Sequence, residues 1–126
     1  MAGLFTDIAS TVLSKTLDAT SARQKAIANN IANVETPGYK RRYVSFEKRL
    51  EAVLARGQRH DIKQGLSELV PVSGTDVASP SKSDGNNVNI DAEIAEMTRT
   101  VLEQRAATVL LEGKGAMLRA AIKEGK

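Results

Sequence analysis

A long heptad pattern near the C-terminal end constrains the fold more than any other feature of this sequence. Between residues 89 and 122, positions on one helical face recur at alternating spacings of four and three residues. This large-residue seam consists of Ile90, Ile94, Met97, Val101, Gln104, Thr108, Leu111, Gly115, Leu118 and Ile122. The spacing predicts one helix of about 50 Å. A compact chain of this length has a radius of gyration of only about 14 Å, so the helix is too long for a globule of this size.

The same segment carries a second series of mostly small residues on roughly the opposite flank. This small-residue seam consists of Ala92, Ala95, Leu102, Ala106, Val109, Ala116 and Ala120. One partner helix would leave one seam in water, so we predict that the helix is sandwiched and that other chains supply part of the contact. The alternative is that alanine is present because it favours helices. Asn89 is the predicted N-cap, and Glu93 and Glu96 are interpreted as first-turn charges that oppose the helix dipole.

The N-terminal segment, from about residue 6 to residue 34, repeats the heptad pattern more weakly. Its positions are Leu13, Leu17, Thr20, Gln24, Ile27, Ile31 and Val34. The next four residues, Thr36 to Tyr39, have Pro37 at the second place and Gly38 at the third, which predicts a type II turn that ends the helix. The predicted fold class is mainly α, with two long terminal helices in an antiparallel coiled-coil-like pair and a short irregular middle segment.

The middle of the chain gives weaker signals. Ser45 is the predicted cap of a short helix that ends by residue 57. The apolar residues of this helix are Phe46, Leu50, Val53 and Leu54. Between residues 71 and 87, 13 of 17 residues are Ser, Pro, Gly, Asp, Asn or Thr, which predicts a linker or mobile loop. We therefore divide the chain into an N-terminal helix (1–35), a middle segment (36–88) and a C-terminal helix (89–126).

Residues suited to catalysis or metal binding are sparse. There are no cysteines, which excludes disulfides and thiolate sites, and we interpret the single histidine, His60, as a solvated loop residue. Residues 84–95 lack the ligands of a calcium loop, and residues 113–115 lack the spacing of a phosphate loop. With two Tyr, two Phe and no Trp, a large dry active site is not expected. We predict no enzyme activity, no cofactor, no metal and no small-molecule substrate.

A basic run with neighbouring aromatic residues offers an alternative function. Residues 40–60 hold seven basic and two acidic residues, and Tyr39, Tyr43 and Phe46 lie beside or among them. Cations bind phosphates and aromatic rings stack on bases, so a small basic helical nucleic-acid-binding protein is the alternative interpretation. No recognised nucleic-acid motif accompanies the run. We therefore favour a solvated or subunit-facing surface and do not expect nucleic acid as a partner.

One string of residues at the end of the N-terminal helix is highly specific. This signature consists of Ala28, Asn29, Asn30, Ile31, Ala32, Asn33, Val34, Glu35, Thr36, Pro37, Gly38 and Tyr39, continued by Lys40, Arg41 and Arg42. It resembles the signature of bacterial flagellar rod and hook proteins. The chain is most similar to the short proximal-rod subunits, also through residues 39–50, 84–91 and 110–122. Tyr43, Glu103 and Gly115 depart from the pattern of that family.

The resemblance implies a non-enzymatic structural subunit of the flagellar basal body. Such a subunit polymerises into the proximal rod through its terminal helices, transmits torque and continues the export channel. The implied partners are other copies of the chain, other rod subunits, the basal adaptor FliE and the flagellar export gate. The implied assembly residues are the signature, in which Ala28 to Asn33 and Thr36 to Tyr39 form the motif, and the seam. The seam residues concerned are Ile94, Met97, Val101, Leu111, Leu118 and Ile122.

The resemblance also implies a route to the assembly site. No signal-peptide pattern is evident at the N-terminus, and the apolar runs are far shorter than the about 20 residues of a membrane span. These features fit export through the flagellar type III apparatus, without a cleavable signal peptide, to the periplasmic part of the basal body. We expect the two terminal helices to be loosely ordered in the exported chain and to pair as they dock into the rod.

Overall fold

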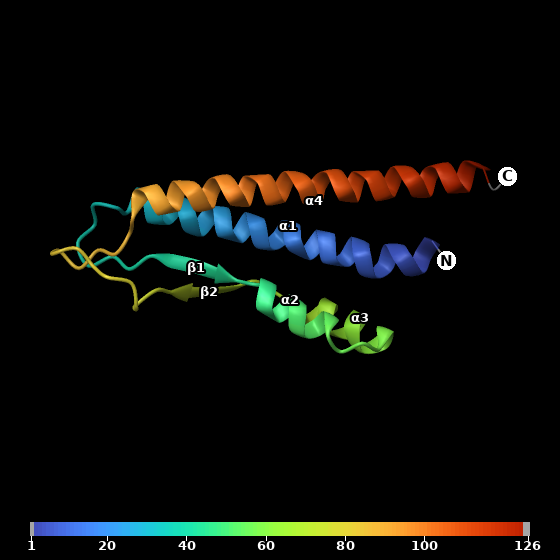
Figure 1. Ribbon diagram of the computed structural model, residues 1–126, viewed down its shortest axis with the longest axis horizontal. Coiled ribbons are helices and arrows are strands. Elements are labelled where there is room, and N and C mark those ends of the chain that lie inside the picture. The colour runs from blue at the N-terminus through green and yellow to red at the C-terminus, as the bar shows by residue number, and fades with distance from the viewer. Residues whose placement is uncertain (1, 125–126) are drawn as a thin grey trace.

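A computed structural model describes residues 2–124; the side chains of residues 2–7, 118 and 124 lie outside that description, and with them the seam residue Leu118. Six elements follow one another along the chain. They are α1 (Ala2–Ala32), β1 (Arg42–Ser45), α2 (Glu47–Leu54), α3 (Arg59–Glu68), β2 (Val72–Thr75) and α4 (Ile90–Glu124). The fold is mainly helical, with long terminal helices around a short middle segment, and the predicted fold class is confirmed (Figure 1).

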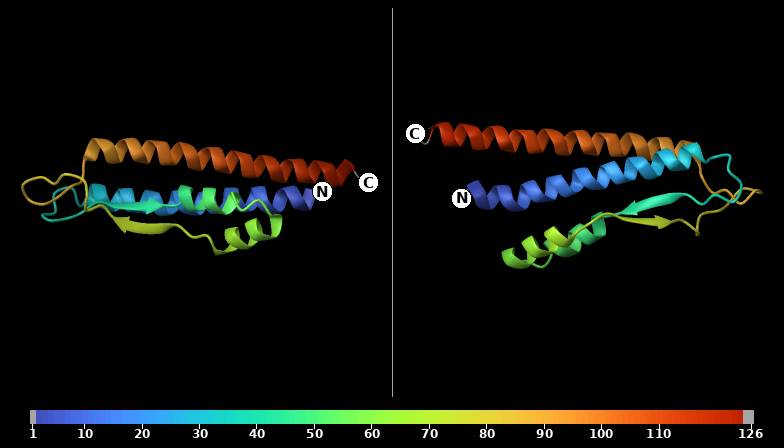
Figure 2. Two further views of the ribbon diagram at one scale, coloured as in Figure 1. Left: turned by 60° about the horizontal axis from the view of Figure 1, so that its bottom comes forward. Right: turned by 180° about the vertical axis from the view of Figure 1, so that it is seen from behind.

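The elements form an elongated, layered structure in which α1 lies in the middle. α4 runs antiparallel to α1 along one side, and the strands with α2 and α3 lie along the other side (Figures 1 and 2). Both chain ends therefore lie at one end of the molecule. The other end, which we call the tip, contains the loops at residues 33–41 and 76–89.

The start of α4 follows the sequence prediction. The backbone N–H of Ala92 donates to Oδ1 of Asn89 at 3.1 Å, which makes Asn89 the cap. Acidic residues Asp91 and Glu93 lie in the first turn, and Lys123 lies in the last. Among the described residues, no helix has the combination of length and hydropathy that spanning a membrane requires.

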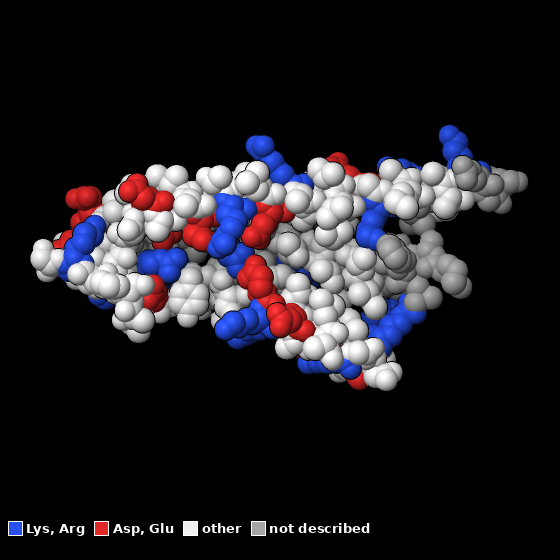
Figure 3. Space-filling view, in the orientation of Figure 1, with Lys and Arg blue, Asp and Glu red and all other residues white. Residues whose placement is uncertain are grey.

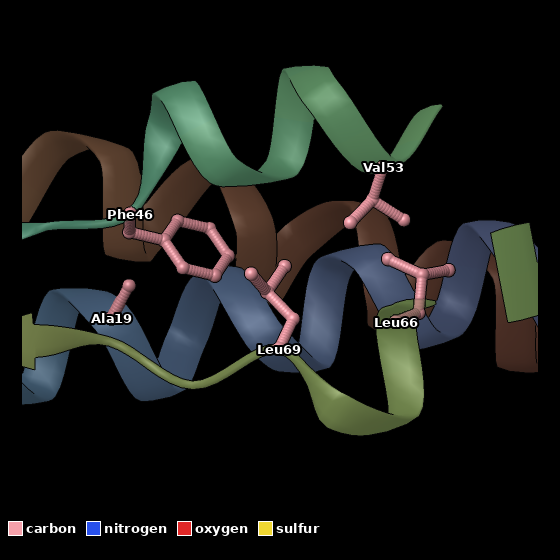
Figure 4. Packing of buried hydrophobic residues seen from close by; sticks show 5 residues of the cluster. All are labelled: Ala19, Phe46, Val53, Leu66 and Leu69. Atoms are coloured by element: carbon pink, nitrogen blue, oxygen red, sulfur yellow. The ribbon is translucent and has the colours of Figure 1, made fainter. Parts of the chain in front are cut away.

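The apolar core is small and lies on the side of α1 that faces the middle segment. It consists of Ala19, Phe46, Val53, Leu66 and Leu69 (Figure 4). Ile8, Val12, Leu50 and Ile62 pack against it while remaining partly exposed. Phe46 is the largest side chain of this cluster and is 2% exposed. The core therefore attaches the middle segment to α1 and contributes little to the contact between α1 and α4.

Two predictions for the middle segment are wrong in detail. Ser45 does not cap α2: it is the last residue of β1 and pairs with Val72, and the cap position belongs to Phe46, which makes no side-chain cap hydrogen bond. β1, β2 and α3 were not expected at all. The strands are only four residues long and pair antiparallel from Arg42 opposite Thr75 to Ser45 opposite Val72. Their pairing is set by contacts distant in sequence, which local patterns do not reveal.

The interpretation of residues 71–87 as a linker or mobile loop is also wrong. This stretch contains β2, and it ends in Asn86 and Asn87, which are 0% and 6% exposed. A run rich in Ser, Gly, Asp and Asn is typical of loops. Here the side chains of Asn86 and Asn87 are buried, and hydrogen bonds to other segments replace those that they would make with water.

The turn after α1 is confirmed. The N–H of Tyr39 donates to the carbonyl of Thr36 at 3.2 Å, and Gly38 has a φ of 75°. A left-handed backbone at the third place is what a type II turn requires.

Two alanine substitutions at glycines should therefore change stability in opposite directions. A Cβ would meet no atom within 4 Å at Gly38 or at Gly113 in α4, so only backbone conformation matters. Gly38→Ala should lower the free energy of unfolding by about 1 to 2 kcal/mol, whereas Gly113→Ala should raise it by up to about 1 kcal/mol. Urea unfolding followed by circular dichroism measures both. A neutral or stabilising Gly38→Ala would contradict the turn assignment.

Candidate functional site: the signature at the tip and the outer face of α4

Asn30 is the centre of the signature. Its side chain is fully buried and binds β1 as a neighbouring strand would. Its Nδ2 donates to the carbonyl of Arg42 at 2.9 Å, and its Oδ1 accepts from the N–H of Arg42 at 2.8 Å. The hydroxyl of Tyr39 donates to the same Oδ1 at 3.0 Å. Asn30 therefore fixes the first residue of β1 against the last turns of α1.

Asn86 joins the signature to the loop before α4. Its Nδ2 donates to the carbonyls of Asn33 and Thr36, each at 2.8 Å, and its Oδ1 accepts from the N–H of Val88 at 2.8 Å. The hydroxyl of Thr36 donates to Oδ1 of Asn33 at 3.0 Å. The carbonyls of Asn33 and Thr36 follow α1 and already accept the N–H groups of Thr36 and Tyr39, so Asn86 supplies each of them with a second donor. The last turn of α1 and the start of α4 are thereby held together.

Asn87 and Arg41 complete the polar hub, which we define as Asn30, Asn86, Asn87, Arg41 and Glu93. Asn87 accepts the N–H of Arg41 at 2.6 Å and donates to the carbonyl of Asp76 at 2.7 Å. The Arg41 guanidinium lies 2.8 Å from Oε1 of Glu93 and 3.2 Å from Oδ2 of Asp76. Burial opposes the charge of Arg41, but these two hydrogen bonds outweigh it, and the pKa of Arg41 is raised.

Asp76 is a well-satisfied carboxylate. The hydroxyl of Ser79 donates to its Oδ2 at 2.6 Å, and the N–H groups of Ser79 and Ala78 donate to its Oδ1 at 3.0 Å. These donors, with Arg41, hold the pKa of Asp76 well below its ordinary value. Asp76 therefore contributes stability that is present above about pH 4 and is lost as the pH falls further.

The tip should consequently be sensitive to acid through Asp76. Asp76→Asn should lower the free energy of unfolding by more at about pH 7 than at about pH 3, because the wild-type carboxylate itself loses stabilisation at low pH. Urea unfolding at the two pH values measures the difference. Ser79→Ala removes one donor to Asp76. Its loss of free energy of unfolding should also be greater at about pH 7 than at about pH 3, but smaller than that of Asp76→Asn. Equal losses at both pH values would contradict the assignment.

A charged groove of about 400 Å³ lies between α1, β1 and α4. Arg23 binds Glu47 through two hydrogen bonds of 2.8 and 3.0 Å, and Arg99 lies 2.6 Å from Glu96. Burial alone would raise the pKa of Glu47, but the hydrogen bonds from Arg23 outweigh that effect and lower it. Charges of both signs are therefore paired along the groove (Figure 3). Among the described residues, no group of three or more acidic or histidine side chains is placed to hold a metal ion.

The signature has an inner and an outer side. Asn30 is buried, and Ile31, Asn33 and Tyr39 are half-buried beside it. The outer residues are Ala28, Asn29, Ala32, Thr36, Pro37 and Gly38, all of which are exposed. The paired asparagines thus differ in their surroundings, because Asn30 faces the hub while Asn29 faces outward.

On α4, the buried line is displaced from the predicted large-residue seam. Met97, Val101 and Leu111 are half-buried, whereas Ile94 and Ile122 are 52% and 60% exposed. The buried side chains among those described on this helix are Glu93, Thr100 and Ala107. Each precedes a seam position by one residue. Gln24 and Gln104, both heptad positions, do meet across the helix pair, with Nε2 donating to Oε1 at 2.8 Å.

The small-residue seam lies on the outer face of α4. Every one of its residues is exposed, and its two largest side chains, Leu102 and Val109, are 60% and 66% exposed. Seven-residue spacing places both on one face of the helix, and their exposure shows that α1 does not cover this face. The helix therefore carries one face toward α1 and a partly apolar face in solvent.

The roles of Glu93, Asn87 and Arg41 in the hub are not predicted from the sequence. Glu93 lies in the first turn of α4, as expected, but it is also 1% exposed and paired with Arg41. Arg41, which was assigned to the basic run, forms ion pairs with Glu93 and Asp76 inside the hub. The available signal was an acidic residue four places after the N-cap Asn89, with an asparagine pair just before that cap. An acidic residue in the first turn is equally typical of an ordinary helix, where it opposes the dipole.

Comparisons with known proteins agree with the signature. The family described as "Flagella basal body rod protein" matches residues 11–40. FlgB of Bacillus subtilis (strain 168) is 31% identical over 121 residues, which cover 90% of this chain and 92% of that protein. FlgB of Borrelia hermsii is 39% identical over 95 residues, covering 64% and 70%. FlgB of Escherichia coli (strain K12) is 28% identical over 116 residues, covering 80% and 84%.

The fold, the signature and these similarities define a class, the structural proteins of the flagellar basal body rod. Within that class, the chain belongs to the FlgB family. It is a structural subunit of the rod, and self-association and contact with other rod subunits follow from that family. The nucleic-acid-binding alternative finds no support in these similarities.

Proposed function

We propose that this subunit polymerises through the outer face of α4 and the outer side of the signature, so that the rod transmits torque and continues the export channel. The observation that carries this proposal is the exposure of the small-residue seam, because a helix with an apolar face in water gains stability when another helix covers it. Leu110, Met117 and Ile122 add exposed apolar area toward the C-terminal end. Heterologous contacts of this kind generate open helical assemblies.

Under this proposal the three predicted segments have different tasks. Residues 1–35 and 89–126 are the assembly segments, which contain α1 and α4, and residues 36–88 form an outer segment attached to α1 by the apolar core. The long contact along the helices carries torque, because many side chains share the load. The small middle segment supports the tip and sets the spacing between neighbouring subunits.

Coupled folding and assembly is the mechanism we propose for rod growth. Among the described side chains of α4, none beyond Ala107 is buried, and the helix ends lie far from the hub (Figure 1). Most helical stability in proteins comes from tertiary packing. The ends of α1 and α4 that carry the termini are therefore loosely held in the free subunit and become ordered when neighbours cover them.

Hydrogen exchange should reveal this gradient. In the isolated subunit, amides of residues 108–122 should exchange about tenfold faster or more than those of residues 93–107, because local opening is easier where packing is sparse. Purified basal bodies should show slow exchange in both ranges. Uniform protection along α4 in a verified monomer would contradict coupled folding.

The finer partners and the route are also part of the proposal. The subunit contacts the basal adaptor FliE and the export gate, and it reaches its periplasmic position through the flagellar type III apparatus without cleavage of a signal peptide. Cross-linking mass spectrometry of purified basal bodies tests the partners. Cross-links between this subunit and FliE are expected; cross-links to other rod subunits alone, in basal bodies that contain FliE, would contradict that contact.

A further inference from the structure

The contact between α1 and α4 contains few side chains that could fix how the helices align along their length. Thr20 lies beside Gln24 on α1, and Thr100 is buried on α4, yet their hydroxyls do not bond across the pair. Thr20 donates to the carbonyl of Leu17 and Thr100 to that of Glu96, within their own helices. Such hydroxyls are satisfied in any alignment of the two helices.

The apolar residue that α4 buries in this contact does not constrain the register either. Ala107 is the buried apolar residue among the described side chains of α4, and an alanine fits as well after a shift of one helical turn, about 5.4 Å. Large interlocking side chains normally specify register in a helix pair. Here Ile27 of α1 is buried, but Met97, Val101 and Leu111 of α4 are only half-buried, so few large side chains interlock along this contact.

The polar contacts that join described residues of α4 to the rest of the fold include three at different levels along the helix. Gln24 and Gln104 form a neutral hydrogen bond of 2.8 Å. Arg23 and Glu103 are 3.9 Å apart, and the Glu103 side chain is 42% exposed, so this pair is weak. The Arg41–Glu93 contact is different, because it is charged, 2.8 Å long and made by a carboxylate that is 1% exposed.

We propose that Glu93, held by Arg41, is the positioning residue that fixes the register of α4. A displaced α4 would leave the Glu93 carboxylate buried without its cation, which is strongly unfavourable. Arg41 cannot follow, because its N–H is bound to Asn87 and its guanidinium also binds Asp76. Oε2 of Glu93 has no hydrogen-bond partner among the described residues. A pair satisfied on one oxygen only is a poor source of stability and a good determinant of alignment.

The consequence for assembly rests on the proposed function. The register of α4 sets the position of Leu102 and Val109, along the length of the molecule, relative to the middle segment. A neighbouring subunit that contacts both the outer face of α4 and the middle segment requires one fixed alignment of the two surfaces. The Arg41–Glu93 pair would thus make every subunit present the same surface.

Pulsed electron paramagnetic resonance on the isolated chain tests the register without requiring assembly. The chain has no cysteine, so spin labels attach only at Ser14→Cys on α1 and Ala95→Cys on α4, both exposed. The test variant is Arg41→Leu/Glu93→Leu, which removes the pair together. The matched control is Arg105→Leu/Glu112→Leu, which removes two exposed charges of opposite sign from α4.

Wild type and control should each give one narrow distance distribution. The test variant should keep its helical circular dichroism and add a second maximum displaced by about 5 Å, one helical turn. An unchanged single distribution in the folded variant would overturn the proposal. If the double variant does not fold, Glu93→Gln decides: a broadened or split distribution supports the proposal, and an unchanged one overturns it. Rod formation plays no part in this result, so it is separable from failure of the proposed function.

Discussion

Leu102→Asp on the outer face of α4 should abolish incorporation into the rod while the isolated subunit stays folded. Leu102 is 60% exposed, so aspartate should change the free energy of unfolding by no more than about 1 kcal/mol. In the rod, the same carboxylate would be buried against a neighbour without a cation. Even a cost of about 3 kcal/mol per contact weakens binding more than about 100-fold, and the cost recurs with every subunit.

Motility of a strain lacking this subunit, complemented with the variant, measures the effect together with the amount of subunit in purified basal bodies. Leu102→Met is the matched control, because it keeps an apolar side chain of similar volume and should restore swimming. Val109→Asp, one heptad further along α4, should fail in the same way as Leu102→Asp. Swimming by a strain that carries Leu102→Asp would show that the small-residue seam faces solvent in the rod.

Asn30→Ala should cause the largest loss of monomer stability among single substitutions in the signature. The side chain binds the N–H and the carbonyl of Arg42 and the hydroxyl of Tyr39. Removing it leaves three groups without their partner at a fully buried position, each at a cost of about 1 kcal/mol or more. We therefore expect the free energy of unfolding to fall by about 3 kcal/mol.

The preceding asparagine supplies the control. Asn29 is exposed on the same turn of α1, so Asn29→Ala should change the free energy of unfolding by no more than about 0.5 kcal/mol. Urea unfolding of the two variants compares them directly. If Asn29→Ala proved as costly as Asn30→Ala, the division of the signature into an inner and an outer side would be wrong.

Both long helices could be predicted from the sequence because their evidence is local and repeated. The heptad spacing over residues 89–122, the cap at Asn89 and the turn at Pro37 and Gly38 each depend on neighbours within a few residues. The exposure of the small-residue seam also agrees with the prediction that a single partner helix covers only one face.

The hub and the middle segment could not be predicted because their evidence is distributed along the chain. Asn86 is buried only because carbonyls of Asn33 and Thr36, some 50 residues earlier, accept its hydrogen bonds. β1 and β2 exist only as a pair, and four residues of either are too few to give a period. Glu93 follows the rule for a first-turn charge, and only the position of Arg41 in the fold makes it a buried partner.

A density map of the intact basal body tests the central claim most directly, because it shows what covers the outer face of α4. We predict that Leu102 and Val109 of each copy pack against a helix of a neighbouring rod subunit, with their exposed area largely buried. A map in which both side chains of an assembled subunit face solvent, while neighbours contact it elsewhere, would contradict the account.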